Sequence, residues 1–315
     1  MSLTRHALVT GGAGFIGSHL CRHLLGQGWQ VTCLDNLCTG SRDNVADMVE
    51  DPRFELRIAD VTEPVACPAE LIFHLACPAS PVQYQADPIE TMRTNVVGTL
   101  ELLKTARSNS ACLIMASTSE VYGDPAMDVQ NEDYWGNVNP VGPRSCYNEG
   151  KRAAESLCMD SVRQFGLAVK IARIFNTYGP AMAFNDGRVV SNFIVAALRG
   201  QPLTIYGDGS QTRSFCYVSD TVEALMRMAD LPAEATGPIN LGNPEPLTMT
   251  ELAGRVLALC DSGSELRYAD LPGDDPSRRC PDIRLAQRLL GWTPKVGLAE
   301  GLTLTIQDFA TRLRR

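Results

Sequence analysis

A tyrosine and a lysine four residues apart, Tyr147 and Lys151, are well suited to proton transfer. They fall in a stretch with helical periodicity, so their side chains lie on the same helix face. A tyrosine is a poor base at neutral pH because its ordinary pKa is about 10. Positive charge beside the ring favours the phenolate, and lowering the pKa by about 3 units corresponds to roughly 4 kcal/mol. The pair therefore predicts a tyrosine base that takes a proton from a substrate hydroxyl.

Further polar side chains follow predicted strands. The run STSE at 117–120 comes directly after an apolar strand, HLAC at 74–77 includes the end of another, and Asp60 and Val61 follow a third. In open parallel sheets, ligands bind beyond the carboxyl ends of the strands. We therefore expect a substrate beside 117–120 and a cofactor against 74–77, with its adenine edge near Asp60.

The stretch HALVTGGAGFIGSHL, residues 6–20, combines a short apolar strand, three spaced glycines and the start of a helix. Gly11, Gly14 and Gly17 allow a tight turn in which backbone N–H groups reach a pyrophosphate at the helix N-terminus. Asp35, at the end of the next apolar run, would accept hydrogen bonds from the adenosine ribose and repel a 2′-phosphate. The sequence therefore predicts NAD rather than NADP as the cofactor.

Strands and helices alternate through the first half of the chain. Strands are predicted at 6–10, 30–34, 54–58, 71–75, 111–116 and 168–174, and helices at 15–27, 42–48, 88–108 and 146–165. This alternation predicts an α/β fold with a Rossmann-type doubly wound parallel sheet. After about residue 175 the segments are shorter and rich in glycine and proline, with helices at 188–199, 219–230, 248–260 and 298–313. We expect an NAD-binding domain over 1–175, to which the chain returns around 214–242, and a smaller, irregular C-terminal substrate lobe over 176–315.

The composition limits the classes of partner. A net charge of −8 argues against nucleic acid and anionic membranes. No apolar run approaches the roughly 18 residues that span a bilayer, and the N-terminus lacks a signal-peptide pattern. The 11 cysteines are scattered without a C-x-x-C pair, which favours reduced thiols over disulfides or a metal site. We expect a cytoplasmic protein with no metal, no nucleic-acid partner and no membrane partner.

Four arginines stand out in the second half of this acidic chain: Arg188, Arg213, Arg278 and Arg279. Arginine side chains suit phosphate and carboxylate groups because their planar fork donates two parallel hydrogen bonds. Since all four lie in the glycine-rich lobe, we expect a doubly anionic ligand there.

Together these motifs resemble the extended short-chain dehydrogenase/reductases that act on nucleotide sugars. The resemblance covers essentially the whole chain and rests on TGGAGFIG, Asp35, STSEVYG at 117–123, and Tyr147 with Lys151. Longer runs resemble the UDP-glucuronate decarboxylase (UDP-xylose synthase) family, among them HLACPASP (74–81), NEDYWGNVNP (131–140), ARIFNTYGP (172–180) and YGDGSQTRSFCYVSD (206–220). This resemblance implies a carboxy-lyase that converts UDP-glucuronate to UDP-xylose through a 4-keto intermediate and regenerates NAD in each cycle.

The resemblance also implies roles for individual residues. Tyr147 is the base, Lys151 tunes it and holds the nicotinamide ribose, and Thr118 binds the sugar. Ser119 and Glu120 lie at the sugar ring, with Glu120 guiding decarboxylation or the protonation that follows. The residues expected to bind NAD are Gly11, Gly14, Phe15, Ile16, Asp35, Asn36, Thr39, Gly40, Asp60, Val61, Leu75, Cys77, Thr94, Ala116, Tyr147, Lys151 and Thr177. Those expected to bind the UDP-sugar are Thr118, Glu120, Asn176, Arg188, Val189, Tyr206, Arg213 and Arg279, the last of which meets the sugar carboxylate.

The residues after Thr118 favour decarboxylation over the related reactions. The 4,6-dehydratases of the family carry an Asp-Glu pair there, and simple 4-epimerases generally lack the glutamate. This chain has Ser119 and Glu120, so the acid that would expel a hydroxyl is missing. A decarboxylase needs no such acid, because oxidation at carbon 4 makes the 5-carboxylate a β-keto acid that loses carbon dioxide.

Two positions depart from the decarboxylase pattern. Asn148 stands where an aspartate is usual, and Ala181 replaces an arginine after the Gly-Pro. Neither change removes a proton-transfer group, so both bear on substrate detail and rate more than on reaction class. The alternatives are a 4-epimerase, a decarboxylase of another uronate, or a non-catalytic NAD-binding sensor. Intact Tyr147, Lys151 and Glu120 argue against a sensor.

Two of the predicted helices carry apolar residues beyond what one sheet face needs. They lie in 88–108 and 146–165 and are Val96, Leu100, Leu103, Leu157, Met159 and Val162. Related enzymes pair these helices across a twofold axis, so the resemblance implies a homodimer with an isologous four-helix contact.

Overall fold

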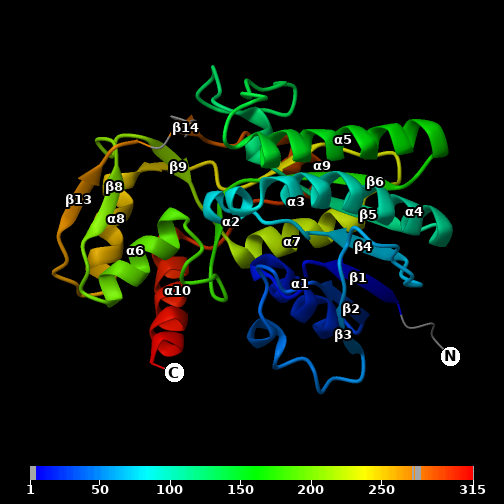
Figure 1. The fold of residues 1–315 in the computed structure, drawn as a ribbon, viewed down its shortest axis with the longest axis horizontal. Coiled ribbons are helices and arrows are strands. Elements are labelled where there is room, and N and C mark those ends of the chain that lie inside the picture. Colours follow the sequence, from blue (N-terminus) through cyan, green and yellow to red (C-terminus); the bar gives the residue numbers. More distant parts are fainter. Residues whose placement is uncertain (1–4, 272, 274–277, 315) are drawn as a thin grey trace.

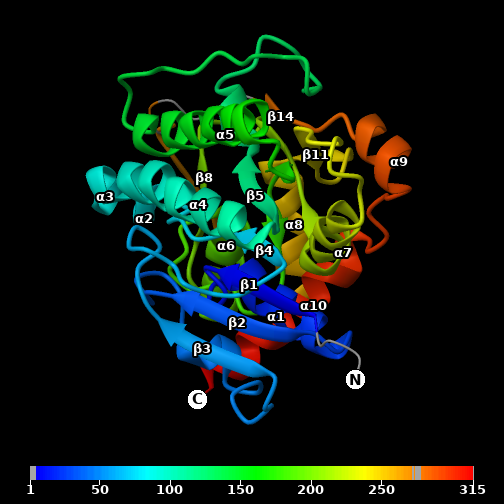
Figure 2. The same ribbon diagram turned by 90° about the vertical axis from the view of Figure 1, so that its right-hand side faces the viewer.

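A seven-stranded parallel sheet forms the centre of the computed structural model, which describes residues 5–271, 273 and 278–314 (Figures 1 and 2). Its strand order is β11-β6-β5-β4-β1-β2-β3. The strands are β1 (His6–Thr10), β2 (Gln30–Asp35), β3 (Phe54–Ile58), β4 (Leu71–His74), β5 (Cys112–Thr118), β6 (Val169–Ile174) and β11 (Ile239–Leu241). The direction of winding reverses between β1 and β4, so the sheet is doubly wound and the predicted fold class is confirmed.

Helices cover both faces of the sheet because its strands are apolar on both faces. Along β1, Ala7 and Val9 pack in one hydrophobic core and Leu8 packs in the other. The first core is closed by α1 (Phe15–Gly26) and α7 (Val218–Ala229), and the second by α4 (Thr99–Asn109) and α5 (Ser145–Phe165) (Figure 2). Near-continuous apolar runs are typical of such a sheet, and the six predicted strands agree with the structure to within two residues.

The helix predicted over 88–108 is interrupted in the structure. It consists of α3 (Pro88–Arg93), a π-helical turn η2 (Thr94–Gly98) and α4. The Asn95 side chain donates to the carbonyl oxygen of Thr91 at 3.0 Å, and the Thr99 hydroxyl donates to that of Asn95 at 2.6 Å. Side chains that bond to the preceding turn in this way compete with the regular helical hydrogen bonds. The wider turn contains Thr94, which lines the central cavity.

Three short helical segments were not predicted, and one was predicted too long. The unpredicted segments are α2 (Pro81–Ala86), the 3₁₀ turn η3 (Ser119–Tyr122) and α9 (Arg284–Leu290). The helix expected near 42–48 is the 3₁₀ turn η1 (Arg42–Val45). All four are too short to show a hydrophobic period, although Ser80 followed by Pro81 is a typical helix start.

The second lobe contains the predicted helices and small sheets that were not predicted. Its helices are α6 (Val189–Leu198), α8 (Met249–Leu259) and α10 (Leu298–Leu313). One sheet pairs β8 (Leu203–Tyr206) with β13 (Leu266–Ala269), and the other has the order β12 (Pro246–Thr248), β9 (Thr212–Ser214), β14 (Arg278–Arg279). Paired strands β7 (Thr177–Tyr178) and β10 (Cys216–Tyr217) lie between the lobe and the central sheet. Strands of two to four residues leave no periodic signal in a sequence.

Two features bear on the expected environment of the chain. Each of the 11 cysteines is a free thiol. Among the described residues there is no helix with the length and hydropathy that crossing a membrane requires.

Candidate active site

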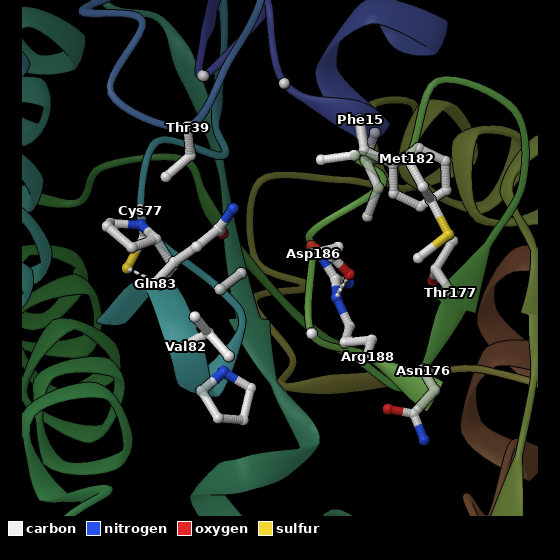
Figure 3. A pocket seen from close by; sticks show the side chains of 18 of the residues that line it. Phe15, Thr39, Cys77, Val82, Gln83, Asn176, Thr177, Met182, Asp186 and Arg188 are labelled. Carbon is white, nitrogen blue, oxygen red and sulfur yellow. Dashed lines mark hydrogen bonds and ion pairs between the residues drawn. The ribbon is translucent and has the colours of Figure 1, made fainter. Parts of the chain in front are cut away.

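A large cavity of about 1150 Å³ opens between the carboxyl edge of the central sheet and the second lobe. Figure 3 shows Thr39, Cys77, Val82 and Gln83 on one side of it and Phe15, Met182, Asp186 and Arg188 on the other. Pockets for a single small ligand usually measure about 300–1,000 Å³. The cavity is therefore large enough to hold two ligands side by side.

The cavity brings together residues that lie far apart in the sequence. The predicted site residues that line it are Gly11, Gly14, Phe15, Ile16, Asp35, Asn36, Thr39, Val61, Leu75, Cys77, Thr94, Ala116, Thr118, Ser119, Glu120, Tyr147, Lys151, Asn176, Thr177, Arg188, Val189, Tyr206, Arg213 and Arg279. Gly40 and Asp60 do not line it, but each lies directly beside a residue that does, Asp35 and Asn36 respectively.

The glycine turn is too crowded for side chains. A Cβ on Gly17 would lie 2.1 Å from the carbonyl oxygen of Gly11, and one on Gly11 would lie 2.8 Å from the backbone of Ala76. Gly11 also has a φ of 70°, which glycine adopts without strain. Gly14 caps α1 without a side-chain hydrogen bond, so the first N–H groups of the helix remain available to a phosphate. This cradle fits the pyrophosphate of a dinucleotide.

Asp35 is buried at the adenosine end of the cavity. Its carboxylate accepts hydrogen bonds from the backbone N–H groups of Ala13 at 3.0 Å and Leu37 at 2.8 Å. Burial raises the pKa of Asp35, and these two N–H groups oppose the increase. A Cβ on Gly40 would lie 2.9 Å from the same carboxylate, so Gly40 packs beside Asp35 rather than facing the cavity.

Asp60 is hydrogen-bonded to Asn36, which lines the cavity. Its carboxylate accepts a hydrogen bond from the Asn36 side chain at 2.9 Å and two from Thr62, at 2.8 Å from the backbone and 2.7 Å from the hydroxyl. Asp60 thereby orients Asn36 at the edge of the cavity.

Tyr147 and Lys151 lie on one face of α5 beside the end of β5. The Lys151 ammonium donates to the carbonyl oxygen of Ala116 at 2.8 Å and lies 6.0 Å from the centre of the Tyr147 ring. Burial lowers the pKa of Lys151. Burial also raises the pKa of Tyr147 well above its ordinary value, with Cys77 and Glu120 adding to the increase, while the Thr118 hydroxyl and Arg188 oppose it. In the protein alone, burial outweighs the nearby ammonium, and the expected lowering of the Tyr147 pKa depends on the positive nicotinamide of bound NAD as well.

A second tyrosine, which the sequence analysis did not single out, lies behind the first. Tyr84 on α2 stacks on Tyr147 with ring centres 5.0 Å apart and planes inclined by 2°. It is fully buried, so it excludes water from one face of the Tyr147 ring. The sequence offered one signal for it: the helix start at Ser80 and Pro81 indicates a short helix that includes Tyr84.

Glu120 lies between two arginines. Its Oε1 is 3.4 Å from Nη1 of Arg279 on β14 and 3.9 Å from Nη1 of Arg144, the residue that precedes α5. The side chains of all three residues are about 10% exposed. Oε2 of Glu120 is buried and has no hydrogen-bond partner among the described residues. Arg144 was not predicted, because nothing in its local sequence indicates that it approaches Glu120.

Two further arginines line the cavity, Arg188 and Arg213. The Arg188 guanidinium donates to Asp186 at 2.6 and 3.1 Å (Figure 3). Burial alone would lower the pKa of Arg188, but Asp186 raises it above the ordinary value. Arg213 on β9 is in register with Arg279 on β14, so both strands present an arginine to the cavity. Arg278 instead lies on the surface and pairs with Asp128.

The two departures from the decarboxylase pattern also lie at this site. Asn148 is buried one turn after Arg144, and its Oδ1 has no partner among the described residues. Ala181 lines the cavity in the left-handed conformation, with a φ of 68°, and its N–H donates to Asp308 at 3.1 Å. An arginine at this position would place its side chain in the cavity. With Ala181 instead, the surroundings of the ligand carry one positive charge fewer.

We predict that Asp35 makes the protein bind NAD at least about tenfold more tightly than NADP, or roughly 1.4 kcal/mol, because its carboxylate repels a 2′-phosphate. Calorimetry measures both affinities directly. Asp35→Ser should reduce the ratio, whereas Glu50→Gln, which changes an exposed charge, should leave it unchanged. Equal or reversed affinities in the unmodified protein would contradict this prediction.

Comparison with known proteins agrees with the geometry. Residues 7–242 match the family described as "NAD dependent epimerase/dehydratase family". The chain is 55% identical over 307 residues to UDP-glucuronic acid decarboxylase 6 of Arabidopsis thaliana, covering 97% of this chain and 89% of that protein. It is 52% identical over 309 residues to UDP-glucuronic acid decarboxylase 1 of Danio rerio, covering 98% of this chain and 73% of that protein.

Solved structures share the whole architecture. UDP-glucose 4-epimerase of Thermotoga maritima with UDP-glucose superposes with a TM-score of 0.86 at 29% identity, over 98% of this chain and 99% of that one. UDP-glucuronic acid 4-epimerase of Bacillus cereus, in complex with UDP-glucuronic acid and NAD, superposes with a TM-score of 0.87 at 27% identity over the same shares. This chain thus belongs to the NAD-dependent epimerase/dehydratase family, the extended short-chain dehydrogenase/reductases.

Proposed function

We propose that the protein is an NAD-dependent UDP-glucuronate decarboxylase that produces UDP-xylose. The observation that carries the proposal is the placement of Glu120 and Arg279 at the end of β5, in the same cavity as the Tyr147 phenol. A buried arginine offers a sugar carboxylate two parallel hydrogen bonds. The identity of 50–55% to UDP-glucuronic acid decarboxylases, over nearly the whole chain, supports the same substrate.

NAD, when bound along the glycine turn and Asp35, supplies a hydride acceptor and then a hydride donor for carbon 4 of the sugar. Tyr147 takes the proton of the 4-hydroxyl as this carbon is oxidised. The resulting 4-keto sugar is a β-keto acid, which loses carbon dioxide and leaves an enolate. Carbon 5 then gains a solvent proton beside Glu120, and Tyr147 returns its proton to the oxygen on carbon 4 as the ketone is reduced.

The other side chains of the cavity hold the substrate in this account. Thr118 and Ser119 bind the sugar next to Tyr147, and Arg279 holds its carboxylate. The UDP portion is bound by other residues that line the cavity: Asn176, Arg188, Val189, Tyr206 and Arg213. Asp186 keeps the Arg188 guanidinium in a fixed orientation, which lowers the entropy lost when it meets a phosphate.

Turnover in heavy water tests this mechanism. UDP-glucuronate should give UDP-xylose with one deuterium at carbon 5 and none at carbon 4, without net consumption of NAD. Mass spectrometry and NMR locate the label. A 4-epimerase would release no carbon dioxide and leave carbon 5 unlabelled, and a sensor would leave the substrate unchanged. Tyr147→Phe serves as the control, since it keeps the ring and NAD binding but should lower turnover about 100-fold or more.

We also propose that two copies of the chain form a homodimer in the cytoplasm through α4 and α5. These helices pack side by side over one face of the sheet (Figures 1 and 2). Of the residues expected at the contact, Leu103 is buried in the chain's own core, Leu157, Met159 and Val162 are only partly buried against it, and Leu100 is 38% exposed. The apolar surface that α4 and α5 offer to a second copy is thus smaller than expected, although Phe165 at the end of α5 is also exposed. The 11 free thiols support a reducing compartment.

Sedimentation at micromolar concentration tests the assembly. The expected species has twice the chain mass of 34.2 kDa. Leu100→Glu should shift the equilibrium toward the monomer, because it would place a charge in an apolar contact. An unmodified protein that sediments as a monomer would contradict the proposed contact.

A further inference from the structure

Arg144 joins two parts of the site that the proposed reaction uses. Its backbone carbonyl accepts hydrogen bonds from the N–H groups of Tyr147 at 3.1 Å and Asn148 at 3.0 Å, in the first turn of α5. Its guanidinium reaches across the cavity to Oε1 of Glu120, with Nη1 at 3.9 Å. Arg144 therefore contacts both the helix that carries the Tyr147 phenol and the Glu120 carboxylate at the end of β5.

Both arginines approach the same oxygen of Glu120. Arg279 lies at 3.4 Å from Oε1 and Arg144 at 3.9 Å, while Oε2 is buried without a partner among the described residues. A buried acceptor without a partner costs about 1–3 kcal/mol. Native proteins retain such atoms mainly where a ligand or a reaction uses them. Because Oε2 is buried without a partner, the ionised carboxylate depends on the two arginines at Oε1.

The two arginines cannot have the same task once substrate is bound. In the proposed function the Arg279 fork turns to the carboxylate of the sugar, which weakens its hold on Glu120. A buried carboxylate that loses its cation pays a large desolvation penalty unless another cation remains. Arg144 is placed to remain, since its backbone is fixed at the start of α5 and its side chain is only 10% exposed.

We infer that Arg144 is a positioning residue that holds Glu120 by Oε1 at its place beside the sugar while Arg279 engages the substrate's carboxylate. This inference rests on the proposed decarboxylation and names a residue that acts on it through Glu120. Arg144 itself does not bind the substrate's carboxylate. Its loss therefore affects the reacting complex more than substrate affinity.

Steady-state kinetics of a set of variants tests this role. Arg144→Met should lower kcat about 100-fold, the size of effect expected when a reacting group is displaced by about 1 Å. It should change KM for UDP-glucuronate less than threefold and leave the affinity for NAD, measured by calorimetry, unchanged. Arg144→Lys should recover much of kcat because it restores the charge. Arg279→Met should instead raise KM strongly. Arg163→Met, an exposed change on the same helix, is the control and should have no effect.

A double-mutant cycle separates action through Glu120 from an independent effect. In a Glu120→Gln background, adding Arg144→Met should reduce kcat no further. Additive losses would overturn the role of Arg144, as would a selective loss of affinity for UDP-glucuronate relative to UDP-glucose, whose sugar carries no carboxylate. If Arg144→Met does not fold, the comparison uses Arg144→Gln, which also removes the charge, in both backgrounds. An unmodified protein that leaves UDP-glucuronate undecarboxylated would instead overturn the proposed function, so the two failures are distinguishable.

Discussion

The hydrogen bond from the Lys151 ammonium to the carbonyl oxygen of Ala116 holds the catalytic elements together. A buried ammonium is costly unless its protons find acceptors, and this bond supplies one at the carboxyl end of β5. It fixes α5 against β5 at one point. Tyr147 lies one turn earlier on α5, and Thr118, Ser119 and Glu120 follow Ala116 directly. Together with the hydrogen bond from the Ser117 hydroxyl to Glu155 of α5 at 2.5 Å, this contact sets the distance between the phenol and the sugar-binding end of the sheet.

Burial around this contact determines which groups carry charge. His74 lies between the hydroxyls of Thr10 and Thr99, and burial, with a smaller contribution from Lys151, lowers its pKa to about 3. It is therefore neutral at pH 7 and leaves Lys151 as the cation beside the cofactor region. Tyr147, enclosed by Tyr84, remains protonated for the same reason, since a phenolate is poorly solvated there. The site is thus arranged so that positive charge brought by a ligand changes the ionisation of one specific group.

The sequence contained enough information for the sheet and the main helices, because buried parallel strands and amphipathic helices leave long apolar patterns. It also contained the glycine turn, whose spacing reflects the close backbone contact between Gly11 and Gly17. The π-helical turn was missed because it arises from the side chains of Asn95 and Thr99 rather than from a change in period. The hydrogen bonds that orient the lining residues were not accessible either, such as the one from the Asn36 side chain to Asp60.

Pairings between distant charges could not be predicted. Arg144 approaches Glu120 only because α5 begins beside the end of β5, and Tyr84 stacks on Tyr147 only because α2 packs against α5. Asp186 lies only two residues from Arg188 in the sequence. Such a spacing does not by itself predict the two hydrogen bonds that join their side chains. Local patterns therefore identified the reacting groups, whereas their electrostatic surroundings depend on the complete fold.

The central claim is that Tyr147 becomes a base only when positive charge joins it in the cavity. Ultraviolet difference titration of tyrosinate measures this directly, with Tyr147→Phe subtracted to isolate one residue. In the complex with NAD, the Tyr147 signal should appear well below the ordinary tyrosine pKa of about 10, and in the protein alone it should be absent up to that pH. The same titration in both states, or no Tyr147 signal in the complex, would contradict this account.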